Sequence, residues 1–138
     1  MIWLGALTTA VLAACGDDAA GVPAAAAKRS MTLSVRFDDG AGRLSRGTLT
    51  CRPGRRRATG IARPAARSCS RIRAAAGLLI SQPRKDRVCT MIYGGPQQVR
   101  VTGAIDGKRV VRNFTRANGC QVADYDRLAI ALPAIRVK

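Results

Sequence analysis

Four cysteines constrain the fold of this chain of 138 residues more than any other feature, and they are Cys51, Cys69, Cys89 and Cys120. Four cysteines in a short exported domain indicate two disulfides, for which three pairings exist. Sequence order favours Cys51 with Cys69 and Cys89 with Cys120, although spacing alone does not choose among the three. Because the chain has no histidine and no Cys-x-x-Cys pair, we expect no metal site.

A fifth cysteine, Cys15, follows an apolar run that is too short to cross a bilayer. Residues 2–14 carry no charge, whereas a spanning helix needs roughly 20 apolar residues. Such a run is typical of a secretory signal, and the Leu-Ala-Ala-Cys sequence that ends at Cys15 resembles a bacterial lipobox. We therefore expect a lipid on Cys15 that anchors the chain to the membrane. The alternative is an ordinary secretory signal with a chance cysteine.

This interpretation divides the chain into three parts. We expect a signal peptide over 1–14, a flexible tether over 15–29 that is rich in alanine, and a domain over 30–138. The mature protein would then lie outside the cell or on the outer face of the cell membrane.

The composition excludes most catalytic classes. The 8 acidic residues are all aspartate, so with no histidine the chain cannot build a Ser-His-Asp or Cys-His centre. Asp124 and Asp126 have no supporting groups nearby in the sequence, and we assign them to the solvated start of a helix. We therefore expect a protein that is not an enzyme and that needs no cofactor.

Basic residues dominate the charge, with 24 Lys and Arg and a formal net charge of +16. Runs at 55–57 and 84–87 are rich in arginine, and such runs attract anionic polymers and lipids. Aromatic residues make up only 4% of the chain, so platforms on which bases could stack are scarce. We therefore expect no specific binding of nucleic acid.

The pattern of apolar residues predicts an α+β fold with an antiparallel sheet. Alternation around Asp106-Gly107 predicts a hairpin over 97–115, since this dipeptide favours a two-residue turn. Helical spacing predicts a helix over 64–76 that ends at Gly77. We further expect an arginine-rich loop over 52–62, a short helix over 123–128 and a last strand over 128–132.

The segment 89–96, Cys-Thr-Met-Ile-Tyr-Gly-Gly-Pro, is the strongest candidate for function. Its middle is apolar, a cysteine fixes one end, and a Gly-Gly-Pro break marks the other. An enzyme that cleaves peptides binds such an extended segment as an added strand, with one side chain in a pocket. The alternative is an ordinary buried strand that leads into the hairpin.

Several motifs together indicate a family. They are the run Thr48–Gly54, the Arg63-Pro64 pair ahead of Cys69, the segment 89–96, the Gly107–Val110 turn with Phe114, and Asn118-Gly119-Cys120. With these motifs the chain resembles the Streptomyces subtilisin inhibitor family of secreted serine protease inhibitors, over residues 48–128. The resemblance implies the disulfide pairing favoured above and a five-stranded antiparallel sheet with two α-helices on one face. It also implies a homodimer formed through the sheet.

The same resemblance assigns roles to individual residues. The reactive bond would be Met91–Ile92, with Met91 in the specificity pocket of a subtilisin-like or chymotrypsin-like protease. The flanking contacts would come from Cys89, Thr90, Tyr93 and Gly94, and Asn118 would support the loop from behind. The competing function is that of a basic surface lipoprotein that binds anionic polymers or lipids and inhibits nothing.

Overall fold

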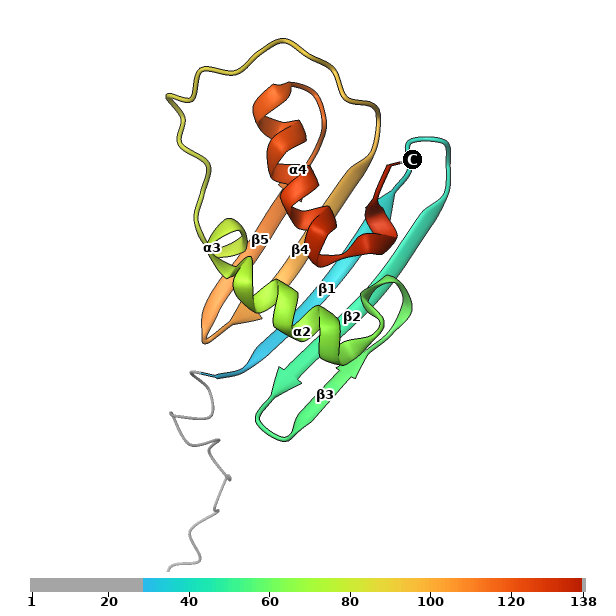
Figure 1. Cartoon of the computed structure of the whole chain (residues 1–138), viewed down its shortest axis with the longest axis vertical. Coiled ribbons are helices and arrows are strands. Elements are labelled where there is room, and N and C mark those ends of the chain that lie inside the picture. The colour runs from blue at the N-terminus through green and yellow to red at the C-terminus, as the bar shows by residue number, and fades with distance from the viewer. Residues whose placement is uncertain (1–28, 138) are drawn as a thin grey trace, which may run out of the picture.

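The computed structural model describes residues 29–137, which form a sheet with helices on one face (Figure 1). The predicted signal peptide, Cys15 and almost all of the predicted tether lie outside the described residues. Within the described part of the chain, no helix is long and apolar enough to cross a membrane. The same part holds no group of three or more potential metal ligands.

Five strands form one sheet, in the order β3-β2-β1-β4-β5, and every neighbouring pair is antiparallel. They are β1 (Met31–Asp38), β2 (Leu44–Arg52), β3 (Arg55–Ala58), β4 (Gln98–Ile105) and β5 (Lys108–Phe114). The predicted α+β class and its five-stranded antiparallel sheet are confirmed.

Alternating side chains explain why these segments are strands with one buried face. In β1, Met31, Leu33 and Val35 are buried while the residues between them are exposed. The predicted hairpin is also present, because Asp106 and Gly107 both have positive φ, of 51° and 79°. Two such residues in a row form the tight turn whose twist matches that of the flanking strands.

The helices cover the apolar face of the sheet (Figure 1). They are η1 (Gly60–Ala62), α2 (Ala65–Ala74), α3 (Ala76–Ile80), α4 (Gly119–Ala131) and η2 (Pro133–Ile135). The two long helices, α2 and α4, correspond to the two that were predicted. The five-residue helix α3 is additional, and Gly77 lies inside it rather than ending the helix before it.

The prediction for the C-terminal segment was wrong, because a single helix replaces the expected short helix and last strand. Tyr125, Leu128, Ala129 and Leu132 are all buried, and their spacing is that of one face of a helix. The alternation of leucine, alanine and isoleucine over 128–132 imitates a strand, but the helical face that begins at Tyr125 continues through it.

The segment 52–62 is also more ordered than predicted. It contains β3, which pairs with β2 from Leu49↔Ala58 to Arg52↔Arg55, and the helical turn η1. This strand lies at the edge of the sheet and reads Arg-Arg-Arg-Ala, so it lacks the apolar alternation by which a half-buried strand is recognised. Charged side chains are typical of such edges because they discourage pairing with other chains.

Both disulfides have the predicted pairing. The Cys51–Cys69 bond joins β2 to α2, and the Cys89–Cys120 bond joins the segment after α3 to the first turn of α4. The first closes a loop of 18 residues across the core, and the second closes one of 31. In a domain of this size such cross-links each stabilise the fold by about 3–4 kcal/mol in the chain-entropy model.

Candidate functional site

The segment 81–97 has no regular secondary structure and passes around the N-terminal end of α4 (Figure 1). Its apolar side chains point into solvent: Val88 is 99% exposed, Met91 91%, Tyr93 66% and Ile92 64%. The alternative of a buried strand is therefore wrong, since these residues neither pair with the sheet nor contribute to the core. Four large apolar side chains exposed within six residues form a surface suited to a partner.

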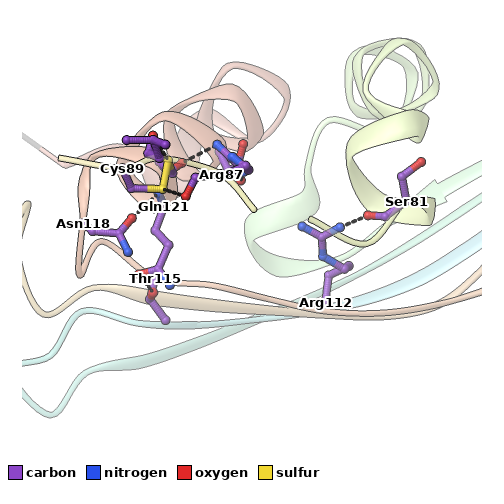
Figure 2. A network of polar contacts seen from close by, with 10 residues as sticks. Ser81, Arg87, Cys89, Arg112, Thr115, Asn118 and Gln121 are labelled. Atoms are coloured by element: carbon purple, nitrogen blue, oxygen red, sulfur yellow. Dashed lines mark hydrogen bonds and ion pairs between the residues drawn. A yellow bond between two sulfur atoms is a disulfide. The ribbon is translucent and has the colours of Figure 1, made fainter. Parts of the chain in front are cut away.

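One side of this exposed stretch is fixed to α4 by Arg87 and the second disulfide. The Arg87 guanidinium lies 2.6 Å from a carboxylate oxygen of Asp124 and also donates a hydrogen bond of 3.3 Å to the Cys120 carbonyl. Figure 2 shows Arg87 and Cys89 together at the start of the helix. The side chain of Asp124 is only 12% exposed. The prediction of a solvated helix start was therefore wrong for Asp124, which fixes the segment in place.

The backbone of Thr90 is held by Gly119, the first residue of α4. The Gly119 N–H donates to the Thr90 carbonyl at 2.9 Å. A Cβ atom added to Gly119 would lie 2.0 Å from the Thr90 hydroxyl oxygen. The close approach of the two backbones therefore depends on glycine at this position.

The other side of the stretch is held at Gly94 by two hydrogen bonds with Arg116. The Gly94 N–H donates to the Arg116 carbonyl at 2.7 Å, and the Arg116 Nε donates to the Gly94 carbonyl at 2.9 Å. Arg116 is itself braced, because it pairs with Asp126 at 2.7 Å and lies over the Tyr125 ring at 5.0 Å. Met91, Ile92 and Tyr93 thus lie between two fixed points.

The Tyr125 ring that supports Arg116 belongs to the core. It is fully buried, and its hydroxyl donates a hydrogen bond of 2.6 Å to the Ile135 carbonyl. Burial raises the pKa of this hydroxyl to about 12, so the group stays neutral and donating throughout the physiological range. The support for Gly94 therefore extends from the surface into the interior of the domain.

Asn118 contributes indirectly. It is the N-cap of α4, and its side-chain oxygen accepts a hydrogen bond of 3.0 Å from the Gln121 N–H. Figure 2 shows Asn118, Thr115 and Gln121 beneath the disulfide, where the Thr115 hydroxyl lies 2.8 Å from the Gln121 side chain. Capping holds the first turn of the helix, and that turn carries Gly119 and Cys120. Support of the loop by Asn118 stays a prediction, and its observed contact is with the start of α4.

The remote ends of the segment are also attached to the sheet. At the start, Arg112 on β5 donates a hydrogen bond to the Ser81 carbonyl (Figure 2) and lies 5.1 Å over the Phe114 ring. Burial lowers the pKa of this guanidinium. At the end, Pro96 packs against the turn between β1 and β2, where a Cβ on Gly40 would come within 2.4 Å of it.

Sequence reasoning identified the exposed residues but missed the groups that hold them. Arg87 belongs to the run 84–87 that was expected to attract anions, but it pairs with Asp124 of α4, and Arg116 pairs with Asp126 of the same helix. The one local indication was the Asn118-Gly119 pair, which lies ahead of the helix that was predicted over 123–128. It combines a good N-cap residue with a residue that permits close backbone approach.

Comparison with known proteins identifies the family of this chain. Residues 25–118 match the family model described as subtilisin inhibitor-like. The chain belongs to the subtilisin inhibitor-like family. Members of this family are protease inhibitors and not enzymes.

A relative of similar sequence supports this assignment. The chain is similar to "Subtilisin inhibitor-like protein 8" of Streptomyces virginiae, with 34% identity over 79 residues, 55% of this chain and 68% of the relative. It is also similar to Streptomyces caespitosus sermetstatin, whose crystal structure is a complex with Bacillus licheniformis subtilisin. That match has a TM-score of 0.43 and 23% identity, and covers 75% of this chain and 96% of sermetstatin.

Replacing Arg116 by glutamine should loosen the exposed stretch without unfolding the domain. The variant loses the hydrogen bond to the Gly94 carbonyl and the pairing with Asp126, and a bond to a charged group contributes about 1.5–3 kcal/mol. We expect the Gly94 amide to exchange hydrogen about 10–100-fold faster, as measured by NMR. Arg84→Gln is the matched control, because within residues 29–137 Arg84 pairs with the exposed Asp86 alone, and it should change nothing at Gly94. Equal exchange in both variants would show that Arg116 does not hold the loop.

Proposed function

We propose that this protein inhibits subtilisin-like serine proteases by presenting residues 89–94 as a substrate that is cleaved poorly. The reactive bond is Met91–Ile92. One observation carries the proposal: the residues at this bond are highly exposed, while the backbone on both sides of them is fixed to the domain. Met91 is 91% exposed, while the neighbouring backbone is bonded to Gly119 on one side and to Arg116 on the other.

Fixed flanks favour tight binding, because a segment that is already ordered loses little entropy when it enters an active site. An extended segment adds to the protease as a strand through its backbone, and one side chain fills the specificity pocket. Met91 is the side chain proposed for that pocket. Cys89 and Thr90 would contact the enzyme on the side before the bond, and Ile92, Tyr93 and Gly94 on the side after it.

The same contacts explain why cleavage would not release the product. If the Met91–Ile92 bond breaks, the new carboxyl end stays attached through Thr90 and the disulfide at Cys89, and the new amino end stays attached through Gly94. Both ends remain on one rigid body, so they face each other and the bond can form again. A flexible peptide of the same sequence would separate after cleavage.

Methionine at the reactive bond favours proteases with an apolar pocket. Its side chain is flexible and polarisable, so it fills irregular apolar cavities. Subtilisin-like and chymotrypsin-like enzymes offer such pockets, whereas an enzyme with a carboxylate at the base of its pocket selects lysine or arginine. Export to the cell exterior and a lipid on Cys15 belong to the same proposal, since they would place the inhibitor where secreted proteases act.

The direct test is titration of subtilisin with the oxidised protein at low and at high ionic strength. We expect one protein to abolish the activity of one enzyme molecule, with little dependence on salt, because an apolar side chain dominates the contact. Complete cleavage of the protein without inhibition would contradict the proposal. Inhibition that disappears at high salt would indicate binding through the basic surface instead.

Met91→Lys should transfer inhibition from subtilisin to trypsin-like enzymes, because the new ammonium group suits a pocket with a carboxylate at its base. We expect the affinity for trypsin to rise at least tenfold, as measured by inhibition constants. Val88→Lys is the matched control, since it adds the same charge at a fully exposed position three residues away. If the control raises trypsin affinity equally, Met91 is not the specificity residue.

Removing the Cys89–Cys120 disulfide should abolish inhibition, whereas removing the other disulfide should leave inhibition intact. The double variant Cys89→Ser with Cys120→Ser frees one flank, and we expect subtilisin to cleave it rapidly at Met91–Ile92 as an ordinary substrate. The double variant Cys51→Ser with Cys69→Ser removes the other disulfide, which lies between β2 and α2, and should keep inhibition at temperatures where it is folded. Mass spectrometry of the products with time distinguishes the two. Tight inhibition by the first variant would rule out the rigid-loop mechanism.

A further inference from the structure

The outer face of the sheet, opposite the helices, carries a row of arginines that the proposed inhibition does not use. The strand register places Arg36 of β1 beside Arg46 of β2 and beside Arg100 of β4. Neighbouring strands lie about 4.8 Å apart, so the three side chains emerge next to one another across the middle of the sheet. All three residues are exposed.

More arginines surround this row. The strand residues on the outer face include seven arginines, which are Arg36, Arg46, Arg52, Arg55, Arg57, Arg100 and Arg109. Among residues 29–137, none of the seven makes a salt bridge. The one carboxylate that the strands place on this face is Asp38, and it accepts a hydrogen bond of 2.8 Å from the Gly40 N–H.

The distribution of ion pairs is therefore uneven over the molecule. The four salt bridges within the described residues use Arg73, Arg84, Arg87 and Arg116, none of which belongs to a strand. Like charges side by side on a sheet repel one another and destabilise it. Bound anions would remove this repulsion, so the outer face has an electrostatic reason to bind them.

The residues beside the row suit oxygen-rich ligands. In the next row along the strands, Ser34 pairs with Thr48 on one side and with Thr102 on the other. These hydroxyls can donate hydrogen bonds to phosphate oxygens while the guanidinium groups supply charge and paired donors. The outer face thus combines both kinds of phosphate contact.

A second copy of this chain is a poor occupant of the face. A two-fold dimer brings the same patch of both subunits together. Through the middle of this sheet it would place the Arg36, Arg46 and Arg100 row against its own copy. Such an interface would bury like charges without partners, which costs several kcal/mol. The positive charge of this face therefore disfavours the homodimer that was expected from the resemblance.

We propose that the outer face binds a linear polymer of phosphate groups. A protein bound in this way leaves the exposed segment 81–97 free to contact a protease. A chain can follow the twist that strands impose on a sheet, whereas a flat membrane touches a twisted face only in part. The face also exposes few large apolar side chains for insertion into lipid, namely Leu44 and Val111. The loop lies beyond the start of α4, which covers the opposite face of the sheet (Figure 1), so both surfaces are accessible at once.

The test uses the full protein and a fluorescently labelled linear polyphosphate. The variant Arg36→Gln with Arg46→Gln and Arg100→Gln should weaken binding about tenfold or more at low salt. It should also reduce the dependence of log affinity on log salt concentration by about two, since each phosphate contact contributes roughly 0.7–0.9. The matched control is Arg67→Gln with Arg127→Gln and Arg136→Gln, which removes three exposed arginines outside the sheet and lowers the net charge equally.

The outcomes separate the proposal from its competitors. Equal weakening by the two triple variants would show that net charge alone attracts the polymer, and would overturn the site. Stronger binding to vesicles of anionic lipid than to polyphosphate would assign the face to a membrane. A tight dimer of the free protein in sedimentation equilibrium, lost on substitution of the arginine row, would show that a second copy covers the face. The proposal does not depend on inhibition, and both triple variants should titrate subtilisin as the unmodified protein does.

Discussion

The bond between Cys89 and Cys120 is the constraint on which the exposed loop depends, because it fixes an otherwise irregular segment to the first turn of a capped helix. Loops of this length without secondary structure are usually mobile. Here the first turn of α4 offers a backbone donor at Gly119 and a sulfur at Cys120, and a carboxylate at Asp124 follows one turn later. The helix start is thus the structural base of the loop, and capping by Asn118 stabilises that base.

Arginine has two different roles in this protein, and its surroundings decide which. Arg87 and Arg116 pair with carboxylates of α4 and hold the two flanks of the loop. The guanidinium group suits this work because one planar group can bond a carboxylate and a carbonyl together. On the outer face of the sheet the arginines form no salt bridge within residues 29–137, and their charge is exposed to solvent.

Sequence patterns correctly predicted those helices and strands that depend on interactions between residues close together in the chain. The hairpin around Asp106-Gly107 follows from two adjacent residues that accept positive φ, and the helix predicted over 64–76 is present as α2. The helix predicted over 123–128 begins earlier, at Gly119, because Asn118 caps it there, and an Asn-Gly pair is common both in turns and at helix starts. Its end was misread because Leu128 to Leu132 alternates like a strand while also continuing a helical face.

The candidate site could be predicted in part for a similar reason. An apolar run between a cysteine and a Gly-Gly-Pro break is visible in the sequence, and so is its resemblance to a family. The partners Arg87 with Asp124, and Arg116 with Gly94, are brought together only by the tertiary fold. No spacing in the sequence identifies which of many arginines will meet an aspartate.

The position of β1 at the centre of the sheet also separates the start of the described chain from the exposed segment 81–97. The chain enters β1 at Met31, beside the turn at Asp106, whose N–H bonds the Ser30 carbonyl. It leaves β1 at the opposite end, where the next turn packs against Pro96 at the base of the loop. The eight residues of β1 separate these ends by about 26 Å. The start of the described chain at Arg29 and the exposed segment 81–97 therefore lie at opposite ends of β1 (Figure 1).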